Sequence, residues 1–541
     1  MSSNKRQKTN DARGKLEIVA PPPPPPYTRL YRHALESIFA HLGLSDLAHV
    51  LATCRDWSSA VTSMRPIAAS VHVATAADAA KLHEIRNSRL MHHLNKFHMS
   101  WRGVLDLTVL CDIIKRSNSL TDVKFSNNDL GDQGAIAIAE AITQSKSLAT
   151  VDLGGNEIGD AGAIAIAEAT KQSRSLVTVI LTSNPIGDIG AVAIAAGIAS
   201  LTALNLSGVL FDAAGSIALA KAIAQSTSLA TVNLSFNDIG DDGAIALATA
   251  IKQSVSLVAV ILSGNEIGDN GAVALAEAIK RSSSLTTVDF GGNKIGAVGA
   301  SSIAEAIKQC KSLTTVDLGV NEIGDAGAAS IAEAVKQSNS LTNVDLSRNN
   351  IGADGVVALA EAIKQNTSLA TLNLNFNIIG VDGAVALAGA IKQSTSLTRV
   401  DLSGIAIGGV GAVALAEAIK QSTSLTTVDL SENSIGCFGV VAITEAIKWS
   451  KSLTTIHLNT TSIGGDDGAD TSALAAAIKQ STSLTTMSLC ANSIGYAGAI
   501  KLAEAVAQSK SLTTLHLDES DIGTKGIAAI HEALKHRREH K

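Results

Sequence analysis

The chain has 541 residues, of which 46 % are hydrophobic but only 3 % aromatic, and its formal net charge is −6. This charge provides no field that would attract nucleic acid, and no uninterrupted run of about 18 apolar residues predicts a membrane-spanning helix. A large globular core normally needs more Phe, Tyr and Trp, so the composition argues against several ordinary globular domains. It favours thin, repeated layers of small side chains in a soluble protein.

The cysteines and the N-terminus indicate the compartment. The five cysteines lie far apart and form no CxxC pair, which argues against a disulfide framework and against a zinc site. No apolar signal-peptide core follows Met1. We therefore expect an intracellular protein, in the cytoplasm or the nucleus, that holds no metal and no cofactor.

Residues 1–29 are polar and include six consecutive prolines, Pro21 to Pro26. Such a tract is an extended spacer that cannot build a core, so we interpret this segment as a disordered leader. The alternative is that the prolines are a ligand for a Pro-binding domain. The cluster from Lys5 to Lys8 matches a short nuclear localisation signal, or it is simply part of the leader.

Residues 30–65 predict two helices in a small domain. Apolar residues fall at helical spacing before Gly43, and Ser45 and Asp46 then supply an N-cap signal for a second helix. The stripe of the first helix consists of Leu35, Ile38, Phe39 and Leu42, and that of the second of Leu47, Val50, Leu51 and Cys54. Residues 66–119 are a transition, in which 94–114 resembles a degraded strand–helix unit. We expect this unit to cap the domain that follows.

From Leu120 onward the chain is an internal repeat, in a domain that spans residues 120–541. Twelve of its fourteen intervals are 28 residues long, whereas the interval from Leu176 is three residues shorter and that from Leu453 three residues longer. We expect irregular stacking at those two places. The opening leucines are Leu120, Leu148, Leu176, Leu201, Leu229, Leu257, Leu285, Leu313, Leu341, Leu369, Leu397, Leu425, Leu453, Leu484 and Leu512.

Each repeat predicts one strand and one helix. The pattern Leu-x-x-Val-x-Leu alternates as a strand with one buried face, glycines follow, and Ala-Ile-Ala-Glu-Ala-Ile is a run of good helix formers. One such unit cannot bury its apolar side alone, so the copies must stack. The expected fold is an α/β solenoid shaped like a horseshoe, with a parallel sheet inside and helices outside.

An asparagine stands eight residues after most of the opening leucines, as at Asn156 and Asn349. We interpret this row as structural, because a buried amide both donates to and accepts from the backbone groups of a turn. Four repeats lack it, and there we expect looser turns. The residues at those positions are Val209, Ile405, Thr461 and Ser520.

The inner, concave face is the expected binding surface. Aspartates four residues after the opening leucine should form one column on parallel strands, and two interpretations stay open: an acidic stripe for a basic partner, or remnants of repetition on a solvated face. The aspartates are Asp289, Asp317, Asp345, Asp401 and Asp429. Interfaces usually depend on aromatic and arginine anchors. The candidates two or three residues beyond the column are Phe236, Phe376, Arg348 and Glu432.

The repeat resembles the leucine-rich repeats of ribonuclease inhibitor and of NOD-like receptors over about three quarters of the chain, with fifteen copies in phase. This resemblance implies a horseshoe that binds proteins. The chain contains no Gly-x-x-x-x-Gly-Lys-Ser/Thr motif, so no NOD-type ATPase is expected within these residues. No nucleophile, metal cluster or phosphate loop indicates an enzyme.

Residues 35–57 resemble an F-box. The match includes Ile38-Phe39-x-x-Leu42, Asp46-Leu47 and Cys54-Arg55-x-Trp57, although His33-Ala34 replaces the usual Leu-Pro and Thr53 the usual Val. The resemblance implies binding to a Skp-family adaptor of a cullin-RING ubiquitin ligase. It also implies that Leu35, Ile38, Phe39, Leu42, Leu47 and Trp57 contact that adaptor or complete the small core.

These resemblances predict a monomeric substrate-recognition subunit of an SCF-type ligase that binds a protein substrate, with no nucleic acid and no membrane. One alternative is a leucine-rich-repeat scaffold or NOD-like-receptor-like sensor without a ligase role. Another is a Ran GTPase-activating protein, a family with the same repeat. That family usually has a strongly acidic C-terminal tail, whereas this chain ends in the basic segment from His536 to Lys541.

Overall fold

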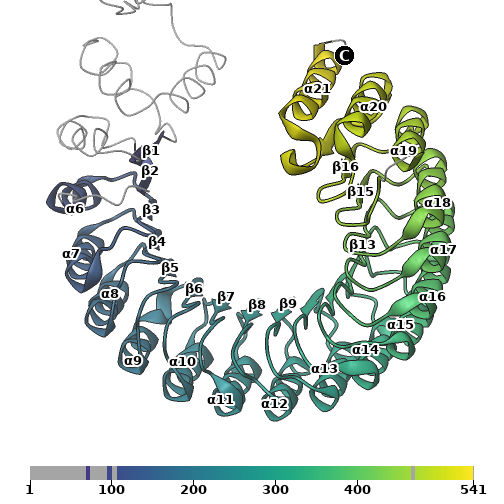
Figure 1. The fold of residues 1–541 in the computed structure, drawn as a ribbon. Coiled ribbons are helices and arrows are strands. Elements are labelled where there is room, and N and C mark those ends of the chain that lie inside the picture. The colour runs from purple at the N-terminus through teal and green to yellow at the C-terminus, as the bar shows by residue number, and fades with distance from the viewer. Residues whose placement is uncertain (1–68, 74–93, 100–106, 465–468, 540–541) are drawn as a thin grey trace, which may run out of the picture.

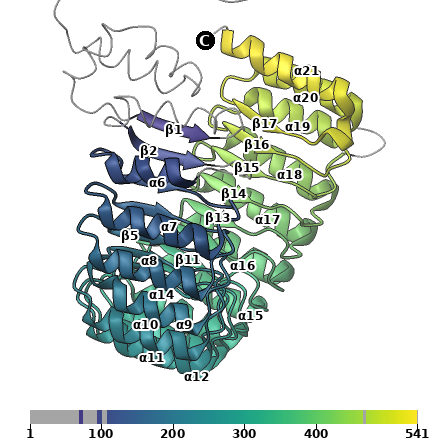
Figure 2. The ribbon, with the colours of Figure 1, turned by 90° about the vertical axis from the view of Figure 1, so that its left-hand side faces the viewer.

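A computed structural model describes residues 69–73, 94–99, 107–464 and 469–539. In these residues the chain forms a horseshoe in which one parallel sheet lines the inside and helices cover the outside (Figure 1). Each strand pairs with the strands of the preceding and following repeats, so that the spatial order follows the sequence from β1 to β17. The side view shows the strand–helix repeats stacked one upon another (Figure 2). The predicted α/β solenoid is confirmed, whereas the small helical domain predicted for residues 30–65 lies outside the described residues.

The strands are short, and most have three residues. Their bounds are β1 (Ala69–Val73), β2 (Leu94–Met99), β3 (Asp122–Lys124), β4 (Thr150–Asp152), β5 (Thr178–Ile180), β6 (Ala203–Asn205), β7 (Thr231–Asn233), β8 (Ala259–Ile261), β9 (Thr287–Asp289), β10 (Thr315–Asp317), β11 (Asn343–Asp345), β12 (Thr371–Asn373), β13 (Arg399–Asp401), β14 (Thr427–Asp429), β15 (Thr455–His457), β16 (Thr486–Ser488) and β17 (Thr514–His516).

The helices follow the strands in alternation. Their bounds are α6 (Leu107–Arg116), α7 (Gly131–Gln144), α8 (Asp160–Gln172), α9 (Asp188–Gly197), α10 (Ala213–Gln225), α11 (Gly240–Gln253), α12 (Asp269–Ile279), α13 (Ala297–Gln309), α14 (Gly324–Gln337), α15 (Ala353–Gln365), α16 (Gly380–Gln393), α17 (Gly408–Gln421), α18 (Gly436–Trp449), α19 (Ala469–Gln480), α20 (Gly495–Gln508) and α21 (Glu519–Glu539). Among the described residues, none of these helices combines the length and the apolarity needed to cross a bilayer.

The strand–helix unit expected before the first full repeat is present as β2 and α6. The edge of Phe97 in β2 packs on the ring of Phe125, with 5.7 Å between the ring centroids. Strand β1 pairs with β2 in parallel and was not predicted.

Small side chains explain how the core is built almost without aromatics. In β10, Val316 and the following Leu318 are buried, while Asp317 between them faces the concave side. On α14 the buried face consists mainly of alanines and Ile331, and Gly327 lies so close to the preceding layer that a β-carbon there would be 3.0 Å from that of Ala300. Layers this close leave no room for large residues.

The asparagine row is structural, as predicted. Asn349 is completely buried, and its Nδ2 donates to the carbonyl oxygens of Leu318 at 2.8 Å and of Ser347 at 2.9 Å. The backbone N–H groups of Asn349 and Ile351 in turn donate to Oδ1 of Asn377, each at 3.0 Å. Each asparagine therefore satisfies backbone groups of its own turn and of the preceding layer.

The repeats that lack this asparagine were expected to have looser turns, but their turns differ from one another. The backbone N–H of Ile405 still donates to Asn433 Oδ1 at 3.2 Å, and the Thr461 hydroxyl donates to the Leu458 carbonyl at 2.8 Å. At Val209 the row is broken, because Oδ1 of the following Asn237 is buried without a partner among the described groups. The side chain of Ser520 lies outside the described residues.

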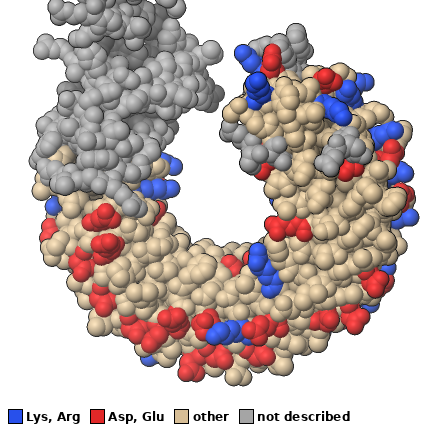
Figure 3. Space-filling model, in the orientation of Figure 1, with Lys and Arg blue, Asp and Glu red and all other residues tan. Residues whose placement is uncertain are grey.

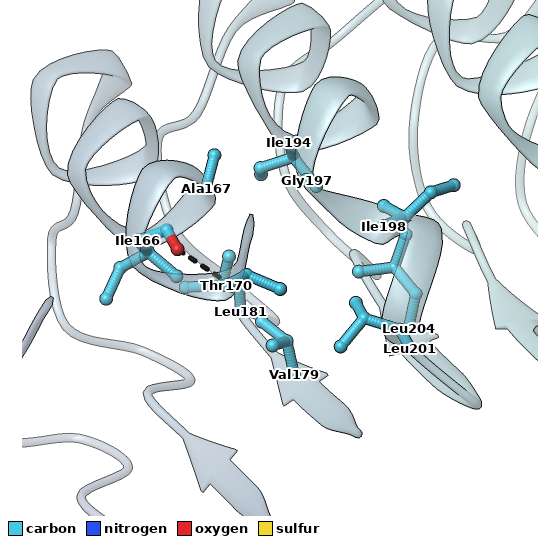
Figure 4. A pocket seen from close by; sticks show the side chains of 10 residues that line it. All are labelled: Ile166, Ala167, Thr170, Val179, Leu181, Ile194, Gly197, Ile198, Leu201 and Leu204. Atoms are coloured by element: carbon cyan, nitrogen blue, oxygen red, sulfur yellow. Dashed lines mark hydrogen bonds between the residues drawn. The ribbon is translucent and has the colours of Figure 1, made fainter. Parts of the chain in front are cut away.

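The short repeat disturbs the stacking, as predicted. Helix α9 ends early at Gly197 and continues as one 3₁₀ turn, η2 (Ile198–Ser200). An apolar cavity of about 10 Å³ remains beside it (Figure 4). The Thr170 hydroxyl, which borders this cavity, already donates to the Ile166 carbonyl at 2.8 Å. A space of this size without a free polar group binds no ligand. The insertion in the long repeat falls on residues 465–468, outside the described residues.

A second hydrogen-bonded row, made of aspartates, was not predicted. Oδ1 of Asp325 accepts the backbone N–H groups of Gly352 at 2.7 Å and of Gly355 at 3.0 Å, and so caps helix α15 of the next repeat. The equivalent aspartates are Asp132, Asp160, Asp188, Asp241 and Asp269. Acidic side chains are visible on the face of the horseshoe over the helices from α7 to α12 (Figure 3).

Candidate partner-binding surface

The five predicted aspartates lie in one column on the concave side of the sheet. Asp289, Asp317 and Asp345 are register partners on β9, β10 and β11. Asn373 follows on β12 and separates them from Asp401 and Asp429, which pair on β13 and β14. The column therefore consists of a group of three and a group of two carboxylates.

Each of these carboxylates is held by its own turn. Oδ1 accepts the backbone N–H of the second residue downstream, for example that of Gly319 at 2.9 Å from Asp317 and that of Ser347 at 2.8 Å from Asp345. Asn373 makes the same bond through its amide oxygen, to the N–H of Asn375 at 3.1 Å. An asparagine therefore meets the structural need, and the negative charge is not required for the turn.

The group of three is crowded. A β-carbon on Gly319 would lie 3.3 Å from Oδ1 of Asp317 and 3.0 Å from Oδ1 of Asp345, so these carboxylates converge. Burial raises the pKa of Asp317 to about 6, and the charges of Asp345 and Asp289 contribute in the same direction. Burial also raises the pKa of Asp289 and of Asp429. The concave face thus holds carboxylates in surroundings that disfavour their charge.

The aspartates differ in how their second oxygen is satisfied. Oδ2 of Asp345 accepts from the Asn373 amide at 2.7 Å, and Oδ2 of Asp401 accepts from the Asn375 amide at 3.2 Å. Within the described part of the chain, no group donates to Oδ2 of Asp317. Asp317 is therefore the aspartate of the three that has the least compensation for its charge.

The predicted anchor residues stand at one turn position, seven residues after the opening leucine. The guanidinium carbon of Arg348 lies 4.1 Å from the centroid of the Phe376 ring, an arrangement that attracts a cation to an aromatic face. Arg348 follows Asp345 by three residues in the same repeat. Phe236 is 68 % exposed but belongs to the repeat of β7, so β8 and β9 separate it from Asp317. Glu432 stands at the same turn position two repeats beyond Phe376.

Two residues of this surface were missed by sequence reasoning. Val320 precedes Arg348 at the same turn position and is 52 % exposed, and Arg399 lies exposed at the start of β13. The signal for Val320 was a β-branched residue at a position where five other repeats have glycine. Among the described residues, no group of three His, Cys, Asp or Glu side chains could hold a metal ion.

The predicted adaptor-binding residues Leu35, Ile38, Phe39, Leu42, Leu47 and Trp57 lie outside the described residues. Their role stays a prediction from the sequence.

Comparison with known families identifies the class of protein. The Leucine Rich repeat family matches twelve segments that together make up more than half of the chain. These segments are 116–139, 144–167, 172–195, 225–248, 253–276, 281–304, 309–332, 337–360, 365–388, 393–416, 421–443 and 508–530. The chain belongs to the leucine-rich-repeat family, whose members bind other proteins. No curated protein sequence matches it.

Three solved structures are similar in part. The yeast Rad7 and Elc1 complex shares 16 % identity, with a TM-score of 0.44 over 75 % of this chain and 90 % of that chain. An internalin (inlF) from Listeria monocytogenes shares 16 % identity, with a TM-score of 0.40 over 76 % and 94 %. The actin-binding site 2 of leiomodin-1 shares 20 % identity, with a TM-score of 0.25 over 28 % and 88 %.

Proposed function

We propose that this protein binds a partner protein on its concave face and presents it as the substrate-recognition subunit of an SCF-type ubiquitin ligase. The observation that carries the binding part is the grouping of Arg348, Phe376 and Asp317 on consecutive repeats of the concave sheet. In this proposal the chain is not an enzyme, and the ligase supplies the chemistry.

The ligase part of the proposal rests on the F-box resemblance of residues 35–57. In it, Leu35, Ile38, Phe39, Leu42 and Leu47 contact a Skp-family adaptor, and Trp57 completes the core of the small domain. The solenoid then holds the substrate at a fixed position relative to the adaptor.

Co-purification tests this part directly. The full chain, expressed with a Skp-family adaptor, should retain the adaptor, and Phe39→Ala or Trp57→Ala should abolish the retention. The matched control is Asp317→Asn, which alters the concave face and should leave adaptor binding unchanged. A wild-type chain that captures no adaptor would contradict the ligase role.

A photo-crosslinking amino acid tests the binding face. It is placed at Val320 on the concave side or, as control, at Val357 on helix α15, which is 44 % exposed. We expect a partner to be cross-linked from the first position only. Equal cross-linking from both would contradict concave binding.

Two alternatives predict different outcomes. A scaffold or sensor without a ligase role binds a partner at Val320 but no adaptor. A Ran GTPase-activating protein accelerates GTP hydrolysis by Ran, so inactivity in that assay removes this alternative.

A further inference from the structure

We propose that Val320, Arg348, Phe376 and Asp317 form one contact patch that binds an extended segment of a partner protein carrying a lysine or arginine next to an apolar residue. This inference rests on the proposed function and specifies the chemistry of the partner.

One turn position presents three of these residues. In every full repeat with a described turn, the residue seven after the opening leucine has a positive φ, which glycine adopts most easily. Val320, Arg348 and Phe376 occupy it in three consecutive repeats, with φ of 57°, 52° and 52°. A β-branched residue such as valine is rarely found there. The backbone conformation of this turn therefore does not explain why these three side chains are present.

These side chains lie on the surface and are not packed into the core. Val320 is about half exposed, and Arg348 is exposed above the Phe376 ring. The ring itself lies across Gly404 of the next repeat, where a β-carbon would be 2.7 Å from Cδ1 of Phe376. The glycine thus makes room for a ring that offers part of its surface outward. An apolar side chain of a partner finds its contact on Val320 and Phe376.

Among the described residues, Asp317 has no cationic partner. Asp317 lies between Asp289 and Asp345 in register, and none of the described ion pairs involves any of these three carboxylates. Asn373 shows that an uncharged amide makes the same turn. The charge therefore has no structural use, and a cation from outside complements it. In a protein segment, that cation is a lysine or arginine side chain.

The shape of the partner follows from the spacing of the repeats. Neighbouring strands lie about 4.8 Å apart, so Val320, Arg348 and Phe376 follow one another along the turns after β10, β11 and β12, and Asp317 lies at the end of β10. An extended segment can place successive side chains along such a row, on the apolar contact and on the carboxylate.

Fluorescence anisotropy with three labelled decapeptides tests the proposal on the full-length protein. The peptides consist of repeated Leu-Arg-Ser, of its charge-reversed form Leu-Glu-Ser, and of Ser-Arg-Ser, which lacks the apolar residue. We expect the Leu-Arg-Ser peptide to bind best and the Leu-Glu-Ser peptide not to bind. Equal binding of the charge-reversed peptide, or no binding of the Leu-Arg-Ser peptide, overturns the proposal.

The variants are chosen so that they preserve folding. Asp317→Asn should weaken binding of the Leu-Arg-Ser peptide about tenfold, whereas its control Asp152→Asn, in the same column on β4, should not. Phe376→Gly should weaken binding of the Leu-Arg-Ser peptide but not binding of the Ser-Arg-Ser peptide. Its control is Ser183→Gly, at the same turn position of another repeat. Equal losses of peptide affinity in a variant and in its control would contradict the proposed contact patch.

The two proposals fail separately. If the peptides do not bind but the Val320 position still cross-links a partner, the concave face remains the binding surface and only the stated chemistry of the partner is wrong. If nothing is cross-linked there, the proposed function itself fails.

Discussion

The carboxylate of Asp325 accepts the backbone N–H of Gly352, which lies 27 residues later in the next repeat, at 2.7 Å. With its N–H bound to that carboxylate, Gly352 has φ −94°. Gly324 stands at the same place in the preceding repeat, but the repeat before it has Ala297 in place of the aspartate. There φ is 58°, and the N–H of Gly324 donates to the Asn349 carbonyl at 3.0 Å.

We expect Asp325→Ala to lower the free energy of unfolding by about 1–2 kcal/mol, because α15 loses the acceptor for two N–H groups. Urea denaturation of the full chain measures the effect. The control is Asp354→Ala, which removes an acidic residue from the first turn of α15 itself. A loss as large in the control would mean that charge near the helix end, and not the bond to the next repeat, stabilises the structure.

Val320→Gly should raise the free energy of unfolding by about 1 kcal/mol, because glycine adopts the positive φ of this position without a steric clash. The same denaturation experiment measures it, with Val320→Ala as the comparison, which keeps a β-carbon and should gain less. Destabilisation by glycine would show that the Val320 side chain contributes to packing.

Asp317→Asn should stabilise the protein at pH 7.5 and keep the turn. In the folded protein the pKa of Asp317 is raised from 3.8 to about 6, so the native state binds the proton more tightly than the unfolded state. The contribution of this residue to stability therefore increases as the pH falls from about 6 to about 4, and is lost above pH 6.

Melting temperatures of the wild type and of Asp317→Asn across this range check the sign. The advantage of the variant should be largest above pH 6 and should shrink toward pH 4. The reverse variant, Asn373→Asp, adds a carboxylate beside Asp345 and should lower the melting temperature at pH 7.5. A constant difference at every pH would rule out titration of Asp317 as the cause.

Asn349→Ala should lower the free energy of unfolding by about 2–4 kcal/mol, since several buried backbone groups lose their partner. Asn349→Thr should cost less, because the Thr461 hydroxyl already serves such a turn. Calorimetry of both variants measures the difference. Equal losses would mean that the hydroxyl does not replace the amide.

The solenoid could be predicted because its signal is repeated. The spacing of Val316 and Leu318 recurs in every copy, and the asparagine row has no other plausible use in a buried turn. The row of caps that includes Asp325 was missed, because an aspartate at the start of a helix already has a local explanation in the helix dipole. Its bond to the next repeat appears only when the layers are stacked.

The candidate site was predicted in part. Its column of aspartates follows from strand register, but their bonds to their own turns do not. The sequence also could not show that Arg348 stacks on the ring of Phe376, because the contact depends on how two turns of neighbouring repeats are placed in space. Val320 was missed because its unusual φ is visible only in three dimensions.

The glycine at the start of most of these helices adopts one of two backbone states: φ is negative where the preceding repeat supplies an aspartate, as at Gly352, and positive where it does not, as at Gly324. Unequal crossing-over that deletes or adds whole 28-residue units would therefore produce junctions that need no compensating mutation. The glycine at a new junction would adopt the negative φ if the repeat before it carries the aspartate, and the positive φ if it does not. The length of the horseshoe, and with it the reach of its inner surface, is in this way open to rapid evolutionary change.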